Sequence, residues 1–330
     1  MGWVAVDDIK GTLKSGKPSS LKLDGYLLKN LDDIPRFLKL AYDCVGIISG
    51  HGKVRIGKSS MAIGTVGSYV AWRLAGGKCR CHQETIEGKE KWVLDYLVHP
   101  KRKVKFDLYE NIAFNAEELQ DKATKLYDKY GKNQILVYDE GRQGLDSARA
   151  MEAINKGMQD FFQTCGMMGH VILIVLPNFF KLHEDYAVAR SLFLIDVYAD
   201  RHHERGYYSF YNEIQKEKLY YFGKKRIGVR AKYDASNENF WGKFSSLFPF
   251  DREEYDKLKR DAIKKIKRSQ VQQKYKRQRD AAFFMLKKNA DLSSEDIANE
   301  ISAISRSKVS GRSVRWSIAA ISRQKVEDID

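Results

Sequence analysis

An eight-residue glycine loop restricts the fold of this chain more than any other feature of its sequence. Residues 52–59 read Gly-Lys-Val-Arg-Ile-Gly-Lys-Ser and match the pattern G-x-x-x-x-G-K-[ST]. The loop follows an apolar run at 44–49 and precedes an amphipathic stretch at 59–75, which is the strand-loop-helix context that gives the pattern its meaning. In that context the backbone N–H groups point inward at the N-terminus of the helix. The sequence therefore predicts a phosphate-binding loop.

Each part of the loop has an expected role. Gly52 and Gly57 permit backbone conformations that other residues avoid. Lys58 is expected to neutralise the β- and γ-phosphates, and Ser59 to offer its hydroxyl to Mg²⁺. The alternative is a glycine-rich turn that happens to precede Lys-Ser. The residues expected to contact the nucleotide are Gly52, Lys53, Val54, Arg55, Ile56, Gly57, Lys58, Ser59 and Ser60.

A second motif strengthens the first. The apolar run at 135–138 ends in Asp139 and Glu140, which is the Walker B arrangement. Asp139 is expected to hold the Mg²⁺ shell and Glu140 to polarise the attacking water. Acid pairs at strand ends also act as helix caps, so this pair carries weight only jointly with the loop. Together they predict ATP and Mg²⁺ as ligands and ATP hydrolysis as the reaction.

Two further polar residues are candidates for the reaction. Asn178 follows the apolar run at 171–176 and is expected to sense the γ-phosphate or orient the water, although Asn is also an ordinary turn residue. Arg190 precedes the next apolar run and is a candidate arginine finger for a neighbouring subunit's γ-phosphate. A surface salt bridge is the alternative role for Arg190. Arg142 and Arg149 are less favoured candidates.

The fold class follows from alternation along residues 43–199. Short apolar runs alternate there with amphipathic stretches, as in βα units around a buried parallel sheet. Asn115 and Glu118 form a capping-box pattern before one of the helices. A doubly wound α/β core is therefore predicted. Its predicted strands are 44–49, 92–97, 135–138, 171–176 and 192–197, and its predicted helices are 59–75, 116–130 and 147–165.

The flanking regions complete a predicted division into four parts. Residues 1–42 form an N-terminal extension with a short helix at 31–40. The ATPase part spans 43–250 and ends in a β-hairpin made from 207–211 and 219–223. Residues 251–288 form a basic helical linker, and 289–330 form a small helical domain. In the hairpin, Tyr207, Tyr208, Phe210 and Tyr211 are expected in the sheet core, with stacking on unpaired bases as the alternative.

Charge indicates the class of partner. The chain has a formal net charge of +15, and residues 257–288 hold 13 Lys/Arg against Asp261 and Asp280. A basic surface of this kind suits nucleic acid or an anionic membrane surface. The longest apolar run is too short to cross a bilayer, so no membrane span is predicted and a cytoplasmic location is expected. Four cysteines are too few for a disulfide framework, and Cys79-Arg-Cys81-His82 is expected to be a reduced surface loop, with half of a zinc site as the alternative.

The C-terminal part has the rhythm of a helix-turn-helix. Ile297, Ala298 and Ile301 give the first helix its apolar positions, and Ser293 or Ser294 is expected to cap it. A second stripe follows at Val314, Ile318 and Ile321. The residues left to face DNA at the start of the second helix are Arg312, Ser313 and Arg315. A bundle for oligomerisation, or a lid over the ATPase, is the alternative.

Together these motifs resemble the additional-strand P-loop ATPases. The order of loop, Asp-Glu pair and polar residue after the next strand is similar to that of FtsK/HerA translocases, zonula-occludens-toxin-like assembly ATPases, terminase motors and AAA+ proteins. The resemblance covers residues 43–199. It implies a homo-oligomer such as a hexameric ring.

Three functions are compatible with this resemblance. The leading one is an ATP-driven, DNA-directed motor of a virus or mobile element, acting in translocation, packaging or unwinding, in a prokaryotic or virus-infected cell. The alternatives are a DNA-binding regulatory or loader ATPase and an ATPase for virion assembly or secretion.

Overall fold

The computed structural model describes residues 3–42, 44–50, 55–100, 105–139, 168–225, 233, 235–290, 292–305 and 309–327. The chain divides into two compact units, Met1–Ala262 and Ile263–Asp330. The boundary between them falls within the predicted basic linker. The predicted helix at 147–165, with Arg142 and Arg149, lies outside the described residues.

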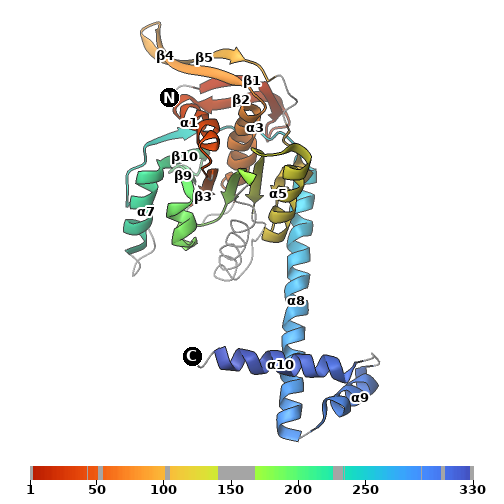
Figure 1. The fold of residues 1–330 in the computed structure, drawn as a ribbon. Helices are drawn as coiled ribbons and strands as arrows, with labels where there is room; N and C mark the ends of the chain where they lie inside the picture. Colours follow the sequence, from red (N-terminus) through yellow and green to blue (C-terminus); the bar gives the residue numbers. More distant parts are fainter. Residues whose placement is uncertain are drawn as a thin grey trace. The chain divides into compact units, whose positions relative to one another are not determined.

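A mostly parallel sheet forms the centre of the first unit (Figure 1). Within the described residues it has seven strands in the order β11-β10-β9-β3-β8-β7-β6. Strands β9, β3, β8, β7 and β6 run parallel, whereas β10 and β11 are antiparallel to their neighbours. The α/β core and four of its five predicted strands are confirmed. The bounds are β3 (Cys44–Ser49), β6 (Ile112–Ala113), β7 (Ile135–Asp139), β8 (Val171–Val175), β9 (Ser191–Ala199), β10 (Arg205–Asn212) and β11 (Phe240–Lys243).

The prediction of a core strand at 92–97 is wrong. These residues belong to β5 (Lys89–Val98), which pairs with β4 (Lys78–Ile86) in a separate two-stranded ribbon. A short apolar run does not by itself distinguish a core strand from a ribbon. The connection between β4 and β5 makes them a hairpin, because Glu87 and Gly88 both have positive φ, at 55° and 71°. Two such residues make the tight turn of an antiparallel hairpin.

Cys79 and Cys81 lie in β4 and are buried, so the prediction of a surface loop there is also wrong. Alternate residues of β4 are covered at its start, which places both thiols on one face of the ribbon. Burial raises the pKa of Cys79, and raises that of Cys81 to about 11. Both side chains therefore pack as small apolar groups.

The predicted hairpin after residue 206 is half correct. Residues 207–211 lie in β10, where Tyr208, Phe210 and Tyr211 are buried, and this confirms their place in the sheet core. Residues 219–223 instead lie in helix α7 (Glu213–Lys225). The Asn212 side chain ends the strand by accepting a hydrogen bond from the Gln215 N–H at 3.0 Å. A capping residue directly after a strand starts a helix, and aromatic content alone does not reveal it.

The N-terminal residues fold onto the same core. Strands β1 (Trp3–Thr12) and β2 (Pro18–Asp24) form a hairpin, followed by helices α1 (Gly25–Asp32) and α2 (Ile34–Lys39). The predicted helix at 31–40 is therefore divided at Asp33, just before Pro35. Val6 and Leu27 belong to the apolar cluster that contains Trp72, and the Trp72 indole N–H donates to Asp8 at 3.0 Å.

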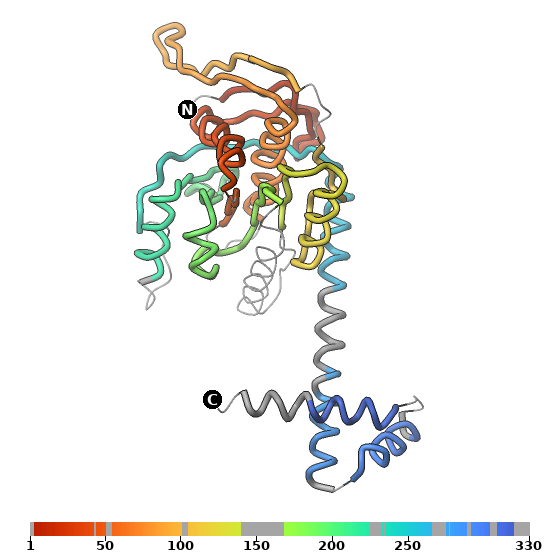
Figure 2. The backbone as a smooth tube through the Cα atoms, viewed as in Figure 1, coloured from red at the N-terminus to blue at the C-terminus, as the bar shows by residue number. Residues whose placement is uncertain are grey.

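Two apolar layers cover the two faces of the central sheet. Figure 2 traces the backbone of the segments that contribute to them. One layer contains η1 (Ser60–Gly67) and α3 (Ser68–Leu74), and the other contains α5 (Ala116–Tyr130), η3 (Phe179–Lys181), η4 (Asp185–Ala189) and part of α7. Predicted helix 59–75 thus corresponds to η1 and α3 in direct succession. The backbone of Leu247 lies very close to Gly64 of η1, where a Cβ would be 1.8 Å from the Leu247 carbonyl oxygen. Only glycine fits at this position.

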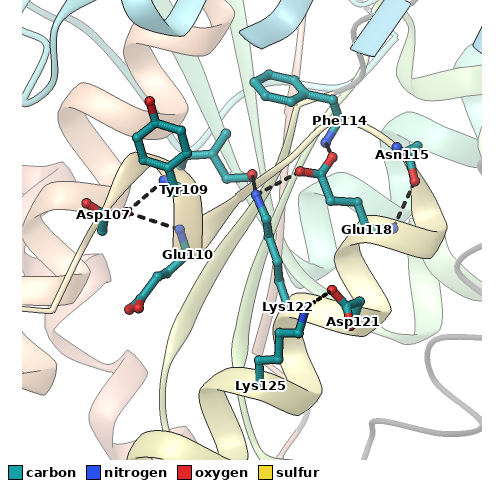
Figure 3. Close-up of polar contacts among 10 residues, drawn as sticks. Asp107, Tyr109, Glu110, Phe114, Asn115, Glu118, Asp121, Lys122 and Lys125 are labelled. Atoms are coloured by element: carbon teal, nitrogen blue, oxygen red, sulfur yellow. Dashed lines mark hydrogen bonds and ion pairs between the residues drawn. The ribbon is translucent and has the colours of Figure 1, made fainter. Parts of the chain in front are cut away.

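Polar side chains cap the N-terminal ends of the short helix α4 (Leu108–Asn111) and of α5 (Figure 3). The Asn115 side chain accepts from the Glu118 N–H at 2.8 Å, as the capping-box pattern predicts. The Glu118 carboxylate reaches one residue further back than expected and accepts from the Phe114 N–H at 2.9 Å. Asp107 caps α4 in the same way through the N–H groups of Tyr109 and Glu110. The predicted bounds of α5, 116–130, are confirmed.

A buried histidine connects α5 to the sheet. His170 Nδ1 accepts from the Gln134 N–H at 3.1 Å, and Nε2 lies 3.1 Å from the Ala123 carbonyl oxygen. The neutral ring satisfies both contacts, with the proton on Nε2. Burial lowers the pKa of His170 below its ordinary value.

The neutral state of His170 predicts a pH dependence of stability. The contribution of neutral His170 to the free energy of unfolding is fully present above the unfolded-state pKa of about 6.5. It is lost as pH falls through the lower folded-state pKa, at up to about 1.4 kcal/mol per pH unit. His170→Gln keeps an acceptor and a donor but does not titrate. Urea unfolding at pH 7.5 and 5.5, about one unit either side of that pKa, is therefore expected to show a larger acid loss for the wild-type protein than for the variant. Equal losses would contradict this account of His170.

The second unit consists of the end of α8 (Arg252–Ala290) together with α9 (Ser294–Ser305) and α10 (Gly311–Glu327). The predicted basic helical linker is one continuous helix, and the two predicted later helices are confirmed. Phe283, Ile297, Ala298 and Val314 form the buried centre, with Ile301 and Ile318 packed against it. Ser293 caps α9, since its hydroxyl accepts from the Asp296 N–H at 3.1 Å. The side chain of Ile321 lies outside the described part.

No helix among the described residues has both the length and the hydrophobicity needed to cross a membrane.

Candidate nucleotide-binding site

The described part of the glycine loop runs from Arg55 to Ser59, whereas Gly52, Lys53 and Val54 lie outside the described residues. Gly57 has φ 105°, which confirms the need for glycine there. Arg55 has φ 59°, a conformation that costs free energy for a side chain of this kind. Ile56 is buried and Ser60 begins η1.

A glycine before the loop makes room for its lysine. A Cβ on Gly50 would lie 2.3 Å from Ile56 Cδ1 and 3.1 Å from Lys58 Cδ. Both distances are shorter than normal contacts, so a side chain at this position would displace the stem of Lys58. The position of Lys58 thus depends on Gly50, a glycine that the pattern itself does not include.

Sheet register brings the acidic strand end to the loop. In the parallel ladders, Ile48 pairs with Val175 and Val175 pairs with Asp139. Because parallel strands end at the same edge of the sheet, Asp139 lies at the edge where the glycine loop begins. Strand β8 lies between the strand before the loop and the strand of Asp139. Glu140 lies outside the described residues.

Two residues from the first turns of α8 contact the Asp139 carboxylate. The Tyr255 hydroxyl donates to Oδ2, and the Lys259 ammonium donates to Oδ1 at 3.0 Å. Asp139 is buried, and the Lys259 side chain is 19% exposed. The same ammonium lies 3.4 Å from the Ser59 hydroxyl oxygen. Sequence reasoning missed both α8 residues.

These contacts set the protonation states of the site. Burial alone would raise the pKa of Asp139, but the Lys259 ammonium and the Tyr255 hydrogen bond hold it below its ordinary value. Burial lowers the pKa of Lys58, and the neighbouring Lys259 lowers it further. The carboxylates of Asp139 and Asp196 oppose the shift at Lys58. Two cations and two anions are therefore gathered at this edge.

Asp196 is a buried acid that sequence reasoning also missed. It pairs in register with Ser49, the last residue of β3, and accepts from the Ser49 hydroxyl at 2.7 Å. The available signal was a single acid inside the apolar run Leu192–Val197. A buried charge in a core strand needs polar partners, and it therefore indicates a network or a site.

The oxygen donors at this edge suit Mg²⁺. The Ser59 hydroxyl and the Asp139 carboxylate already converge on one cation, the Lys259 ammonium. Mg²⁺ prefers such hard oxygen ligands and takes its remaining ligands from water and phosphate. The described residues contain no group of three or more His, Cys, Asp or Glu placed to hold a metal. Two protein oxygens are enough when the phosphates supply others.

Asn178 and Arg190 lie at opposite edges of the sheet, Asn178 after the end of β8 and Arg190 before the start of β9. Asn178 caps η3, with its side-chain oxygen accepting from the Phe180 N–H at 3.0 Å, as the turn alternative requires. Arg190 directly precedes β9, which runs parallel to β3, so it lies at the opposite edge of the sheet from Lys58. It lines a groove of about 580 Å³ together with Arg36 and Tyr42. Within one chain, Arg190 is therefore far from the loop.

The predicted DNA-facing residues lie at the start of α10. Arg312, Ser313 and Arg315 are exposed there. Trp316 is 66% exposed beside them, and sequence reasoning missed it. The Arg315 guanidinium pairs with Glu295 of α9 at 2.6 Å. Helix α10 thus presents cations and one large aromatic ring on its first turns.

The chain matches none of the family models, curated proteins or solved structures with which it was compared.

Proposed function

We propose that this chain is a Mg²⁺-dependent ATPase of the additional-strand P-loop class. The convergence of Ser59 and Asp139 on one cation, beside Lys58, is the observation that carries the proposal. The position of β8 between β3 and β7 supports it, because an inserted strand is the feature for which this class is named. The positive φ of Gly57 supports the loop conformation.

Each residue of the site then has a role. The loop N–H groups and Lys58 bind the β- and γ-phosphates and stabilise the charge that develops during transfer. Ser59 and Asp139 would hold Mg²⁺, which would supply positive charge to neutralise the phosphates. Glu140 orients the attacking water and accepts its proton. Tyr255 fixes the Asp139 carboxylate through the oxygen that Lys259 does not contact.

Nucleotide hydrolysis is proposed to act on DNA. The 13 Lys/Arg between 257 and 288 supply the salt-dependent part of affinity for phosphates. The exposed ring of Trp316 and the side chains of Arg312 and Arg315 supply contacts to bases and backbone. A DNA-directed motor of a virus or mobile element combines both features. Arg190, at the far edge of the sheet, then serves a neighbouring copy in a ring.

Two other roles use the same chemistry. A regulatory or loader ATPase would recognise one DNA site through α10, and this role is favoured by the exposed helix. An ATPase for virion assembly or secretion would use the site without DNA.

Measurement of ATP turnover with and without long single- and double-stranded DNA separates these roles. The motor is expected to show turnover that rises strongly with DNA of any sequence. A regulator would instead protect one sequence from nuclease digestion and lose that footprint when residues after Arg279 are removed. If DNA changes neither turnover nor electrophoretic mobility at low salt, the DNA-directed proposal is refuted and the assembly role remains.

The α10 surface is tested by Trp316→Ala, since loss of a stacking ring is expected to weaken DNA binding about tenfold. Trp241→Ala is the matched control, because that ring is 47% exposed in the first unit. Fluorescence anisotropy with labelled DNA at low salt measures both. Equal affinities for the two variants would contradict a role for Trp316.

A further inference from the structure

The Lys259 ammonium is bound as a metal ion would be. Its three N–H groups face three oxygens, at 3.0 Å from Asp139 Oδ1, 3.1 Å from the Tyr255 hydroxyl and 3.4 Å from the Ser59 hydroxyl. Two of these oxygens are the ones assigned to Mg²⁺. The side chain is mostly buried, so this is a specific arrangement rather than a solvated surface charge.

The ammonium and Mg²⁺ exclude each other from this position. Both need Asp139 Oδ1 and the Ser59 hydroxyl, and two cations a few ångströms apart repel strongly in a partly buried site. We propose that Lys259 holds the cation position in the nucleotide-free protein and that Mg²⁺ arriving with ATP displaces it. This inference rests on the proposed ATPase function and adds a regulation of the same site.

Displacement by Mg²⁺ is expected to affect Lys259 but not Tyr255, although both belong to α8. Tyr255 and Lys259 lie one turn apart on one face of the helix. Tyr255 donates to Oδ2 of Asp139, and its ring packs against Phe248 with centroids 5.0 Å apart. Because Oδ2 is not the oxygen that the ammonium uses, Tyr255 keeps its contact when Mg²⁺ binds. The start of α8 therefore stays anchored while the Lys259 side chain is released.

The exchange of cations couples nucleotide state to α8. Without Mg²⁺, Lys259 compensates the charge of Asp139, which would otherwise repel the γ-phosphate. With Mg²⁺, the released ammonium is free to contact phosphate or solvent. Lys259 thus raises the Mg²⁺ concentration that nucleotide binding requires, and its release marks the loaded state on the helix that leads out of the first unit.

Lysine acylation of the wild-type full chain tests the release directly. The protein is treated with an N-hydroxysuccinimide ester alone, with a non-hydrolysable ATP analogue in EDTA, and with the analogue plus Mg²⁺, and modification is read by mass spectrometry. Lys259 is expected to be protected in the first two states and more reactive in the third. Lys257, exposed on the same helix, is the internal control and is expected to react equally in all three. Equal reactivity of Lys259 in all states would overturn the inference.

A variant tests the competition. Lys259→Met removes the charge at similar volume, so the Mg²⁺ concentration for half-maximal binding of a fluorescent ATP analogue is expected to fall about tenfold, the factor for one charge-assisted hydrogen bond. In EDTA the same variant is expected to bind the analogue more weakly than the wild type. Lys89→Met, at an exposed position of the β4–β5 ribbon, is expected to match the wild type in both conditions.

The outcomes separate this inference from the proposed function. If the wild-type protein binds no nucleotide, the ATPase proposal itself fails. If it binds nucleotide but Lys259→Met shows the wild-type Mg²⁺ dependence, the displacement of Lys259 is refuted and the ATPase proposal stands.

Discussion

Lys58→Ala is expected to abolish ATP hydrolysis, lowering turnover by at least about a hundredfold, as does loss of other groups that stabilise transition-state charge. The residue lies next to Asp139 and Asp196, and burial and the nearby Lys259 lower the pKa of its ammonium. A bound phosphate would favour the charged form of Lys58. Loss of Lys58 removes a contact that strengthens as the phosphoryl group is transferred.

The change at Lys58 is measured by phosphate release and by binding of a fluorescent ATP analogue. Lys89→Ala, an exposed lysine of the β4–β5 ribbon, is the control and is expected to behave as the wild type. Thermal unfolding should show that both variants remain folded. Hydrolysis that persists at the wild-type rate in Lys58→Ala would remove the glycine loop from the account.

Asp139→Asn is expected to have two effects, because the carboxylate serves two partners. It removes a Mg²⁺ ligand, so hydrolysis should fall by at least about a hundredfold. It also leaves the Lys259 ammonium without its ion pair. Breaking a buried pair costs about 3–5 kcal/mol, and the partial exposure of Lys259 places the expected loss of folding stability below about 3 kcal/mol.

A double variant separates these effects. In Asp139→Asn with Lys259→Met, the stranded charge is gone, so the free energy of unfolding should recover relative to Asp139→Asn alone while hydrolysis stays lost. Asp128→Asn, an exposed position of α5, is the control for the substitution itself. Urea unfolding gives the stabilities. Additive losses in the double variant would mean that Asp139 and Lys259 do not interact in solution.

The parts of the fold that sequence predicted are those encoded locally. Strands β3, β7 and β8 are continuous apolar runs, and α5 carries its own cap at Asn115. The errors at 92–97 and 219–223 arose where a short apolar or aromatic segment fits several structures. The turn at Glu87 places 92–97 in a hairpin, and the cap at Asn212 places 219–223 in a helix.

The residues of the site also differ in whether a local pattern reveals them. The glycine loop and Asp139 were predicted because each is a short pattern beside a strand. Tyr255 and Lys259 lie 116 and 120 residues from Asp139 in the sequence. No local pattern indicates that the start of a basic helix contacts the acid at the end of β7. Asp196 meets Ser49 through sheet register, which depends on strand order. Contacts of this kind are set by tertiary packing alone.

The most direct test of the central claim is phosphate release from ATP by the purified full chain, with Mg²⁺ and with EDTA, beside Glu140→Gln. The wild type is expected to hydrolyse ATP only with Mg²⁺, and Glu140→Gln is expected to bind ATP without hydrolysing it. No turnover by the wild type under any condition, or equal turnover by the variant, would contradict it.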